Sequence, residues 1–184
     1  NLFFIGSTYT KDIISCNKDV DTFIDYNHIL SLNNEDKIQY IKSLNLDIVI
    51  FAFPCKELAR LMKKSKVKTR IATSHRIYNW LYCNSLVNFS RKNSNLNEAQ
   101  LNTFLLKPLK LFKSYSLKDL YSFINLRIQS TDSTYKDLLS KEKFNLIIHP
   151  KSNKSAVEWS MDNYNELIEL LNPNIQVFVC GTKK

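Results

Sequence analysis

The sequence predicts an α/β protein built on parallel β-sheets. Strand-like apolar runs alternate with amphipathic helical segments, and the connections between them are short. Asp47–Phe53 (DIVIFAF) is continuously apolar, which is typical of a parallel strand buried on both faces. A second buried strand, Phe144–Ile148, is followed by a polar loop and an amphipathic helix. We therefore expect two Rossmann-like β–α arrays in the 184 residues.

The first array occupies the N-terminal part of the chain. Asn33 or Asn34 is suited to cap a helix whose apolar face contains Ile38, Ile41 and Leu44. We expect strands at Leu2–Ile5, Val20–Tyr26, Asp47–Phe53 and Thr69–Thr73, and helices at Thr10–Ser15, Asn34–Leu44 and Lys56–Lys66. This alternation predicts one Rossmann-like domain over residues 1–115.

The segments that follow are less regular. Ser74–Phe89 is rich in aromatic residues and has no clean periodicity, so no element is predicted there. Asn95–Leu109 has a helical apolar stripe, which Pro108 should end or bend. Weak patterning predicts an interdomain connection over residues 116–143. The second domain, 144–184, contains strand Phe144–Ile148, helix Ser160–Leu171 and strand Ile175–Cys180.

Composition limits the functional class. A hydrophobic content of 44% with 23% charged residues is that of a soluble globular protein. The formal net charge of +9 favours an anionic partner, such as a nucleotide-sugar, a phosphorylated lipid, a membrane surface or a nucleic acid. A solvated basic surface without a partner explains the same charge, so charge alone does not choose.

The cysteines predict neither a metal site nor a disulfide framework. No two of the four have C-x-x-C spacing, so we expect no zinc. Cys180 follows an apolar run and is expected to be a buried thiol in a strand, in a reducing cytoplasm. No apolar run approaches the roughly 20 residues of a membrane span, and no signal peptide is recognisable. The chain begins within a strand-like run and stops just after a strand, so we expect a fragment lacking both ends.

The polar loop His149–Ser155 is the first candidate site. A strand, a polar loop and a helix place unpaired backbone N–H groups and a helix N-terminus at the carboxyl edge of a sheet. The phosphates of a nucleotide or nucleotide-sugar bind well in that position. An ordinary β–loop–α unit without a ligand has the same generic pattern.

Specific residues in this region resemble a known motif. His149-Pro150, Ser152, Ser155-Ala156 and Glu158-Trp159 are similar to the H-P-G-S-x-x-S-A-K-x-W-P segment of bacterial glycosyltransferase family 9, the ADP-heptose:lipopolysaccharide heptosyltransferases. Further motifs of this family follow in the expected order. They are Leu46–Ile50 (yD-v-v-i), Arg70–Thr73 (R-I-G-T, with Ala72 for Gly), Ser74–Tyr78 (G-x-R-x-Y), and Glu98 and Asn102 before Leu105–Leu109 (H-E-x-x-x-N…L-L-x-P-L-G, with Asn97 for His).

The resemblance implies a GT-B-like architecture, with two Rossmann-like domains that are both incomplete in this chain. It implies heptose transfer with inversion from a nucleotide-heptose (ADP-heptose) to a lipopolysaccharide core or lipid A-linked acceptor. The partners are then the sugar-nucleotide donor and a lipid-linked saccharide, with peripheral contact to the inner membrane from the cytoplasm. No cofactor, metal or nucleic acid is expected. The catalytic acidic base is expected outside this chain, as is the donor-contacting D-S-G-P-x-H segment.

The resemblance also assigns roles to individual residues. Ser152 matches the hydroxyl near the donor phosphates, although a loop serine often bonds its own backbone. Val157 stands where the family has a lysine that steadies the diphosphate, so Lys151 or Lys154 would have to supply the cation. Either lysine is otherwise a solvated loop residue.

Three residues of the first domain are candidates for the acceptor side. Arg76 is predicted to face an anionic acceptor, or else to lie in a surface loop. Glu98 and Asn102 lie four residues apart on one helix face and are predicted to form a polar network at the interdomain cleft. An exposed helix face is the alternative. The replacements at Val157, Asn97 and Ala72 leave a second function open, a degenerate, non-catalytic homologue that binds a sugar nucleotide or a partner.

Overall fold

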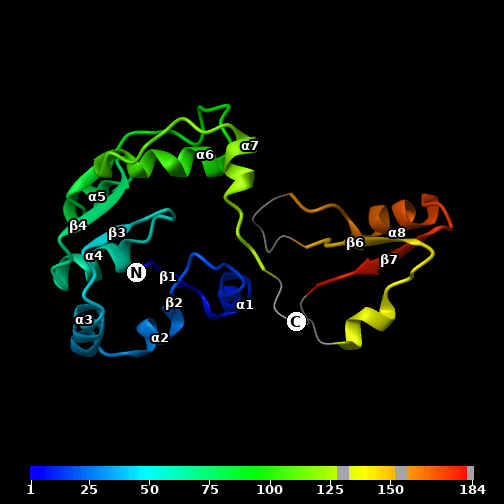
Figure 1. Ribbon diagram of the computed structural model, residues 1–184, viewed down its shortest axis with the longest axis horizontal. Coiled ribbons are helices and arrows are strands. Elements are labelled where there is room, and N and C mark those ends of the chain that lie inside the picture. The colour runs from blue at the N-terminus through cyan, green and yellow to red at the C-terminus, as the bar shows by residue number, and fades with distance from the viewer. Residues whose placement is uncertain (128–132, 152–156, 182–184) are drawn as a thin grey trace. The chain divides into compact units, whose positions relative to one another are not determined.

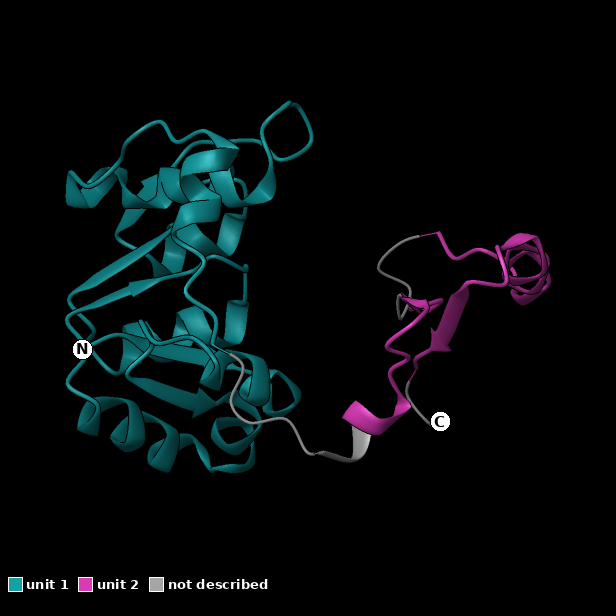
Figure 2. Cartoon of the chain, turned by 45° about the vertical axis from the view of Figure 1, so that its right-hand side comes forward, with its two compact units in different colours: residues 1–127 teal, residues 128–184 magenta. Residues whose placement is uncertain are grey.

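The computed structural model describes residues 1–127, 133–151 and 157–181. The chain divides into two compact units, residues 1–127 and 128–184 (Figure 2). The boundary between them falls inside the predicted connection, 116–143. Within the described residues, no helix is long and apolar enough to cross a membrane.

The first unit contains parallel strands, as predicted (Figure 1). β1 pairs with β2, and β3, β4 and β5 form a separate sheet in that order. The strands are β1 (Phe3–Gly6), β2 (Thr22–Asp25), β3 (Ile48–Ile50), β4 (Thr69–Thr73) and β5 (Ser85–Val87). The helices are η1 (Thr8–Thr10), α1 (Lys11–Ser15), α2 (Tyr26–Ser31), α3 (Asn34–Ser43), α4 (Lys56–Lys64), α5 (Ile77–Tyr82), α6 (Glu98–Thr103), η2 (Phe104–Leu109) and α7 (Leu117–Ser122), where η marks a 3₁₀ helix.

Side-chain caps fix where several of these helices begin. The Asn33 side chain accepts hydrogen bonds from the backbone N–H groups of Glu35 and Asp36, at 3.0 and 2.9 Å, and so starts α3. Asn97 starts α6 through a reciprocal pair of hydrogen bonds with Gln100. Asn97, at the position of the histidine in the motif that this segment resembles, therefore serves as a helix cap.

The core of the first unit lies on both faces of β4. Ile71 and Ala72 are neighbours in this strand, so they point to opposite faces, and both are 0% exposed. On the Ala72 face, the buried cluster comprises Ile24, Ile29, Ile41, Phe51, Ala59, Met62, Val67, Ala72 and Cys83. On the Ile71 face, it comprises Ile71, Val87, Phe89, Leu101 and Leu105. Helices therefore cover both faces of this sheet, as in a doubly wound fold.

β3 is shorter and more exposed than its sequence predicts. Only Ile48–Ile50 form the strand, and both of these isoleucine side chains are exposed. Among the described residues, β3 pairs with β4 alone and is an edge strand of its sheet, so the prediction of burial on both faces is wrong for it. Phe51 is buried and continues the pairing by one hydrogen bond, from its N–H to the Ile71 carbonyl at 2.9 Å.

Several elements arise where the sequence pattern predicts none. Among them, α5 and β5 both lie within Ser74–Phe89. The helical pattern of α5 is obscured because its buried residue is polar, Asn79, whereas Ile77 and Trp80 are exposed. The predicted helix Asn95–Leu109 forms, but as α6 followed by the 3₁₀ helix η2, which contains Pro108.

The second unit is a smaller β–α–β array. Its elements are η3 (Ser133–Leu138), β6 (Phe144–Ile148), α8 (Met161–Leu170) and β7 (Ile175–Val179), and β6 pairs with β7 in parallel. Phe144 and Ile147 are each 68% exposed, so the prediction that β6 is buried is wrong for most of the strand. The few elements described in this unit offer too little surface to cover both faces of the strand pair. Cys180, predicted to be buried, is an exposed thiol just beyond β7.

We expect Ile71→Ala to lower the free energy of unfolding by about 2–4 kcal/mol, because the substitution removes buried apolar contacts and leaves a cavity that the surrounding side chains fill only in part. Urea denaturation followed by circular dichroism measures the change. Ile77→Ala is the matched control: Ile77 is exposed, so its change should stay within about 0.5 kcal/mol. Equal changes for the two variants would contradict the packing described for β4.

The four cysteines are free thiols, and their reactivities should differ. Burial raises the pKa of the Cys83 thiol to about 11, so at pH 8 its reactive thiolate is scarce. We expect Cys83 to be alkylated at least ~100-fold more slowly than Cys180 in the native protein at pH 8. The rate at Cys83 should rise with pH up to about 11. Peptide mass spectrometry after timed alkylation measures both rates, and comparable rates would refute this prediction.

Candidate functional site

An arginine-centred network lies at the carboxyl edge of the β3–β4–β5 sheet. Arg91, in the loop after β5, donates from Nε to Glu98 Oε1 at 2.7 Å. Its Nη2 donates to Asn102 Oδ1 and to the Ala52 carbonyl, each at 3.0 Å. Glu98 and Asn102 are therefore joined through Arg91, while their place at an interdomain cleft stays a prediction. Arg91, which joins them, is absent from the sequence-based predictions.

This network fixes a guanidinium group at the edge where doubly wound sheets bind ligands. The Arg91 side chain joins the loop after β3 to helix α6 and lies over the Phe89 ring, 5.1 Å from its centroid. A planar guanidinium reaches three acceptors at once, which an ammonium group does not do with the same rigidity. The arrangement provides one fixed cation beside two oriented polar side chains.

Arg76 lies in the loop after β4, immediately before α5. Its side chain is exposed, and among the described residues it has no carboxylate within ion-pair distance. Asn79 Nδ2 donates to the Thr73 carbonyl at 2.8 Å and holds the start of α5 against the end of β4. Burial raises the pKa of Tyr78, and the nearby positive charge of Arg76 opposes that shift.

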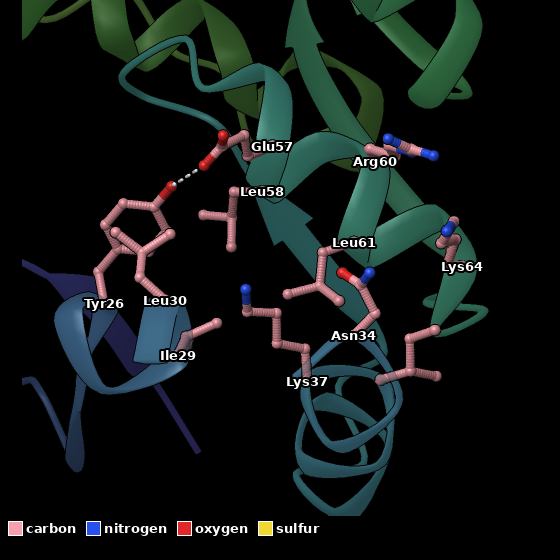
Figure 3. A pocket seen from close by; sticks show the side chains of 11 residues that line it. Tyr26, Ile29, Leu30, Asn34, Lys37, Glu57, Leu58, Arg60, Leu61 and Lys64 are labelled. Atoms are coloured by element: carbon pink, nitrogen blue, oxygen red, sulfur yellow. Dashed lines mark hydrogen bonds between the residues drawn. The ribbon is translucent and has the colours of Figure 1, made fainter. Parts of the chain in front are cut away.

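Tyr26 and Glu57 lie at one end of a pocket of about 280 Å³ between α2, α3 and α4 (Figure 3). The Tyr26 hydroxyl lies 3.3 Å from Glu57 Oε2 and 3.4 Å from Cys55 Sγ. Burial, followed by the contacts with Cys55 and Glu57, raises the pKa of Tyr26 far above its ordinary value, so the phenol stays protonated. The cations that line this pocket are Lys37, Arg60 and Lys64.

Asp25, at the end of β2, is a carboxylate that the sequence-based predictions do not include. Thr8 Oγ1 donates to Asp25 Oδ2 at 2.8 Å, and the Asn27 backbone N–H donates to Asp25 Oδ1 at 2.9 Å. These hydrogen bonds, the one from Thr8 first, lower the pKa of Asp25. A carboxylate stabilised in this way is a weak general base, and its role is to cap α2.

In the second unit, Lys151 and Glu158 form an ion pair with Lys151 Nζ 3.1 Å from Glu158 Oε2. The predicted donor-site residues Ser152 and Lys154 lie outside the described residues. Val157 is fully exposed, so its side chain has no packing role in the described structure. The cation of Lys151 is engaged by Glu158.

His149, Trp159 and Ser160 make contacts within this unit. His149 Nδ1 lies 3.3 Å from Cys180 Sγ and 3.2 Å from the Cys180 carbonyl oxygen, which links the ends of β6 and β7. Trp159 packs edge-on against Tyr164 at 5.3 Å, although half of its side chain remains exposed. Ser160 caps α8 by accepting a hydrogen bond from the Asn163 backbone N–H at 3.2 Å.

The predicted residues thus fall into separate groups. Glu98 and Asn102 are joined through Arg91, whereas Arg76 makes no hydrogen bond to them in the part of the chain that the structure describes. Lys151 belongs to the other compact unit. No group of three or more His, Cys, Asp or Glu side chains within the described residues is arranged to hold a metal ion.

Comparison with solved structures identifies the fold. The chain superposes on a family 9 glycosyl transferase from Veillonella parvula DSM 2008 with a TM-score of 0.64 and 13% sequence identity, covering 96% of this chain and 52% of that one. The chain has a GT-B-like glycosyltransferase fold. The E. coli ADP-heptose LPS heptosyltransferase II gives the same TM-score and identity, with 96% of this chain and 54% of that one covered.

The resemblance carried by the sequence motifs is therefore confirmed at the level of the fold. This GT-B-like chain spans about half the length of the solved structures that it matches. No protein-family model matches the sequence. No curated protein matches it either.

We expect Arg91→Ala to lower the free energy of unfolding by about 1 kcal/mol, because three acceptors lose their shared donor. Arg91→Lys should be about as destabilised as Arg91→Ala, since an ammonium group cannot reproduce the hydrogen bonds of the planar guanidinium group. A double-mutant cycle with Glu98→Gln, measured by urea denaturation, should give a coupling of roughly 0.5 kcal/mol that falls at high salt. A coupling of zero at low salt would show that the pair is not formed in solution.

Proposed function

We propose that this chain is part of an inverting glycosyltransferase that transfers a heptose from ADP-heptose to a lipopolysaccharide core acceptor linked to lipid A. The enzyme works at the cytoplasmic face of the inner membrane. The observation that carries the proposal is the agreement between the order of the family motifs in the sequence and the GT-B-like fold.

The motif residues of the first unit support this assignment by their positions. Arg70–Thr73 belong to the central strand of the β3–β4–β5 sheet. Glu98 and Asn102 converge on Arg91 at its carboxyl edge. This is the edge at which open α/β sheets bind their ligands. In the proposed enzyme, Arg91 organises the polar groups of the acceptor side, and Arg76 supplies an exposed cation for an acidic acceptor.

The second unit supports the donor side of the proposal. β6 precedes the polar loop in the sequence and the capped start of α8 follows it, which is the order of elements that suits a diphosphate. We assign Ser152, Lys154 and Lys151 to the donor phosphates. The chemical requirement is stabilisation of the negative charge that develops on the leaving diphosphate while the acceptor hydroxyl attacks the anomeric carbon.

A second candidate function is a non-catalytic homologue that binds the sugar nucleotide or a partner. It is favoured by Val157, which has an apolar, fully exposed side chain at the position of the family lysine. A valine provides no charge to a leaving diphosphate. The engagement of Lys151 with Glu158 points in the same direction, because a paired cation is less available to an added anion.

Transfer assays on the full-length protein that contains this chain test both functions. We expect the unmodified protein to release ADP only when both ADP-heptose and acceptor are present. In Val157→Lys we expect kcat to rise on the order of 10²-fold, because the added ammonium group stabilises the leaving diphosphate. Leu170→Lys is the matched control. It adds the same charge at an exposed position of α8 and should leave kcat unchanged.

The outcomes separate the two functions. Transfer by the unmodified protein supports the enzyme. Transfer by Val157→Lys alone supports a homologue that lost its activity through this replacement. If neither protein transfers heptose while both bind ADP-heptose in calorimetry, the binding function stands and the enzymatic proposal fails.

A further inference from the structure

The helix α5 presents an apolar face to solvent. Ile77, Trp80 and Leu81 are 87%, 66% and 60% exposed, and their i, i+3, i+4 spacing places them on one side of the helix. Most large apolar side chains in a globular protein are at least partly covered. Three adjacent ones on a single short helix form a surface that is suited to an apolar environment.

The exposure of this face is fixed by the fold. On the opposite side of α5, Asn79 is buried and bonded to the Thr73 carbonyl, and Cys83 is buried after the helix ends. The Trp80 indole N–H donates to the Ser74 carbonyl at 2.9 Å, so its polar atom is satisfied while most of the ring stays exposed. An indole with a bonded N–H and a free ring face is well suited to the boundary between water and lipid.

Positive charge gathers on the neighbouring helix α4. This helix carries Lys56, Arg60, Lys63 and Lys64 and one carboxylate, Glu57. α4 packs beside α5 (Figure 1). Lys63 of α4 donates to the Leu81 carbonyl at 2.6 Å, which joins the cations of α4 to the apolar residues of α5.

The cations continue around α4 to the pocket between α2, α3 and α4. Arg60 and Lys64 extend from the same side of α4 at the pocket's edge (Figure 3). Neither has a carboxylate partner within ion-pair distance in the described part of the chain. Unpaired cations on α4 and exposed apolar side chains on α5, which packs beside it, match the two layers of an anionic membrane surface, its headgroups and its acyl chains.

We propose that α4 and α5 form a membrane-docking surface for anionic lipid. Ile77, Trp80 and Leu81 enter the headgroup–acyl boundary, and Arg60 and Lys64 bind lipid phosphates. This inference deepens the proposed function, on which it rests for its biological purpose, by naming the surface through which the enzyme reaches a lipid-linked acceptor. Vesicle binding is measured without donor or acceptor, so it fails or succeeds independently of heptose transfer.

Vesicle co-sedimentation of the full-length protein tests the proposal. Binding is compared on phosphatidylcholine vesicles and on vesicles that also contain phosphatidylglycerol. We expect binding to the anionic vesicles only, weakened by salt. The variant Ile77→Ser/Trp80→Ser/Leu81→Ser should lose at least about tenfold in partitioning. Arg60→Gln/Lys64→Gln should lose about tenfold.

A matched control removes exposed apolar residues elsewhere. Leu117 and Tyr121 are exposed on α7, and Leu117→Ser/Tyr121→Ser should bind vesicles as the unmodified protein does. Urea denaturation confirms that each variant is folded. Brominated lipid should quench tryptophan fluorescence in the unmodified protein more than in Trp80→Phe, because bromine quenches only rings that enter the bilayer.

Three results would overturn the proposal. They are equal binding to the two vesicle compositions, unchanged binding of the α5 variant, and equal quenching with and without Trp80. If the α5 variant instead changes the oligomeric state in sedimentation velocity without lipid, the face belongs to a contact between copies of the protein, and the membrane proposal is wrong.

Discussion

The first unit depends on the double burial of β4. Successive side chains of a strand point to opposite faces. Ile71 and Ala72 therefore belong to two separate apolar clusters, one on each face of β4. The parallel hydrogen bonds to β3 and β5 then align the loops after all three strands at a common edge. The Arg91 network forms at that edge, between the loops after β3 and β5 and helix α6. A defect in the packing of β4 would therefore disturb the candidate site without touching any of its polar residues.

The elements predicted correctly from sequence are those whose local and tertiary preferences agree. β4 and β6 have the predicted bounds, α3 begins at its predicted cap, and α8 begins within one residue of its predicted start. β3 and β6 are more exposed than predicted because an apolar run reveals strand propensity, whereas burial depends on what packs on each face. α5 was missed because its inward residue is an asparagine, and a buried amide bonded to a backbone carbonyl leaves no mark in a hydrophobic pattern.

The candidate site also contains residues that the sequence predicts and residues that it does not. The four-residue spacing of Glu98 and Asn102 predicts that they share one face of the helix. In the structure both side chains accept a hydrogen bond from Arg91. Arg91 itself was not predictable, since it lies in a loop and reaches its partners only through the fold. Asn97 illustrates the reverse case. A motif position that appeared degenerate in sequence has a defined structural role as the cap of α6. A replacement in a motif is thus weak evidence for lost function until the partner of the new side chain is known.

The separation of β1–β2 from β3–β4–β5 also affects how the first unit resists opening. Side chains of one apolar cluster connect the two sheets, with Ile24 and Ile29 on one side and Phe51 and Met62 on the other, but no backbone hydrogen bond in the described residues crosses between them. The β1–β2 sheet is therefore held to the rest of the first unit by side-chain packing, which allows its local stability to differ from that of β4 and its neighbours.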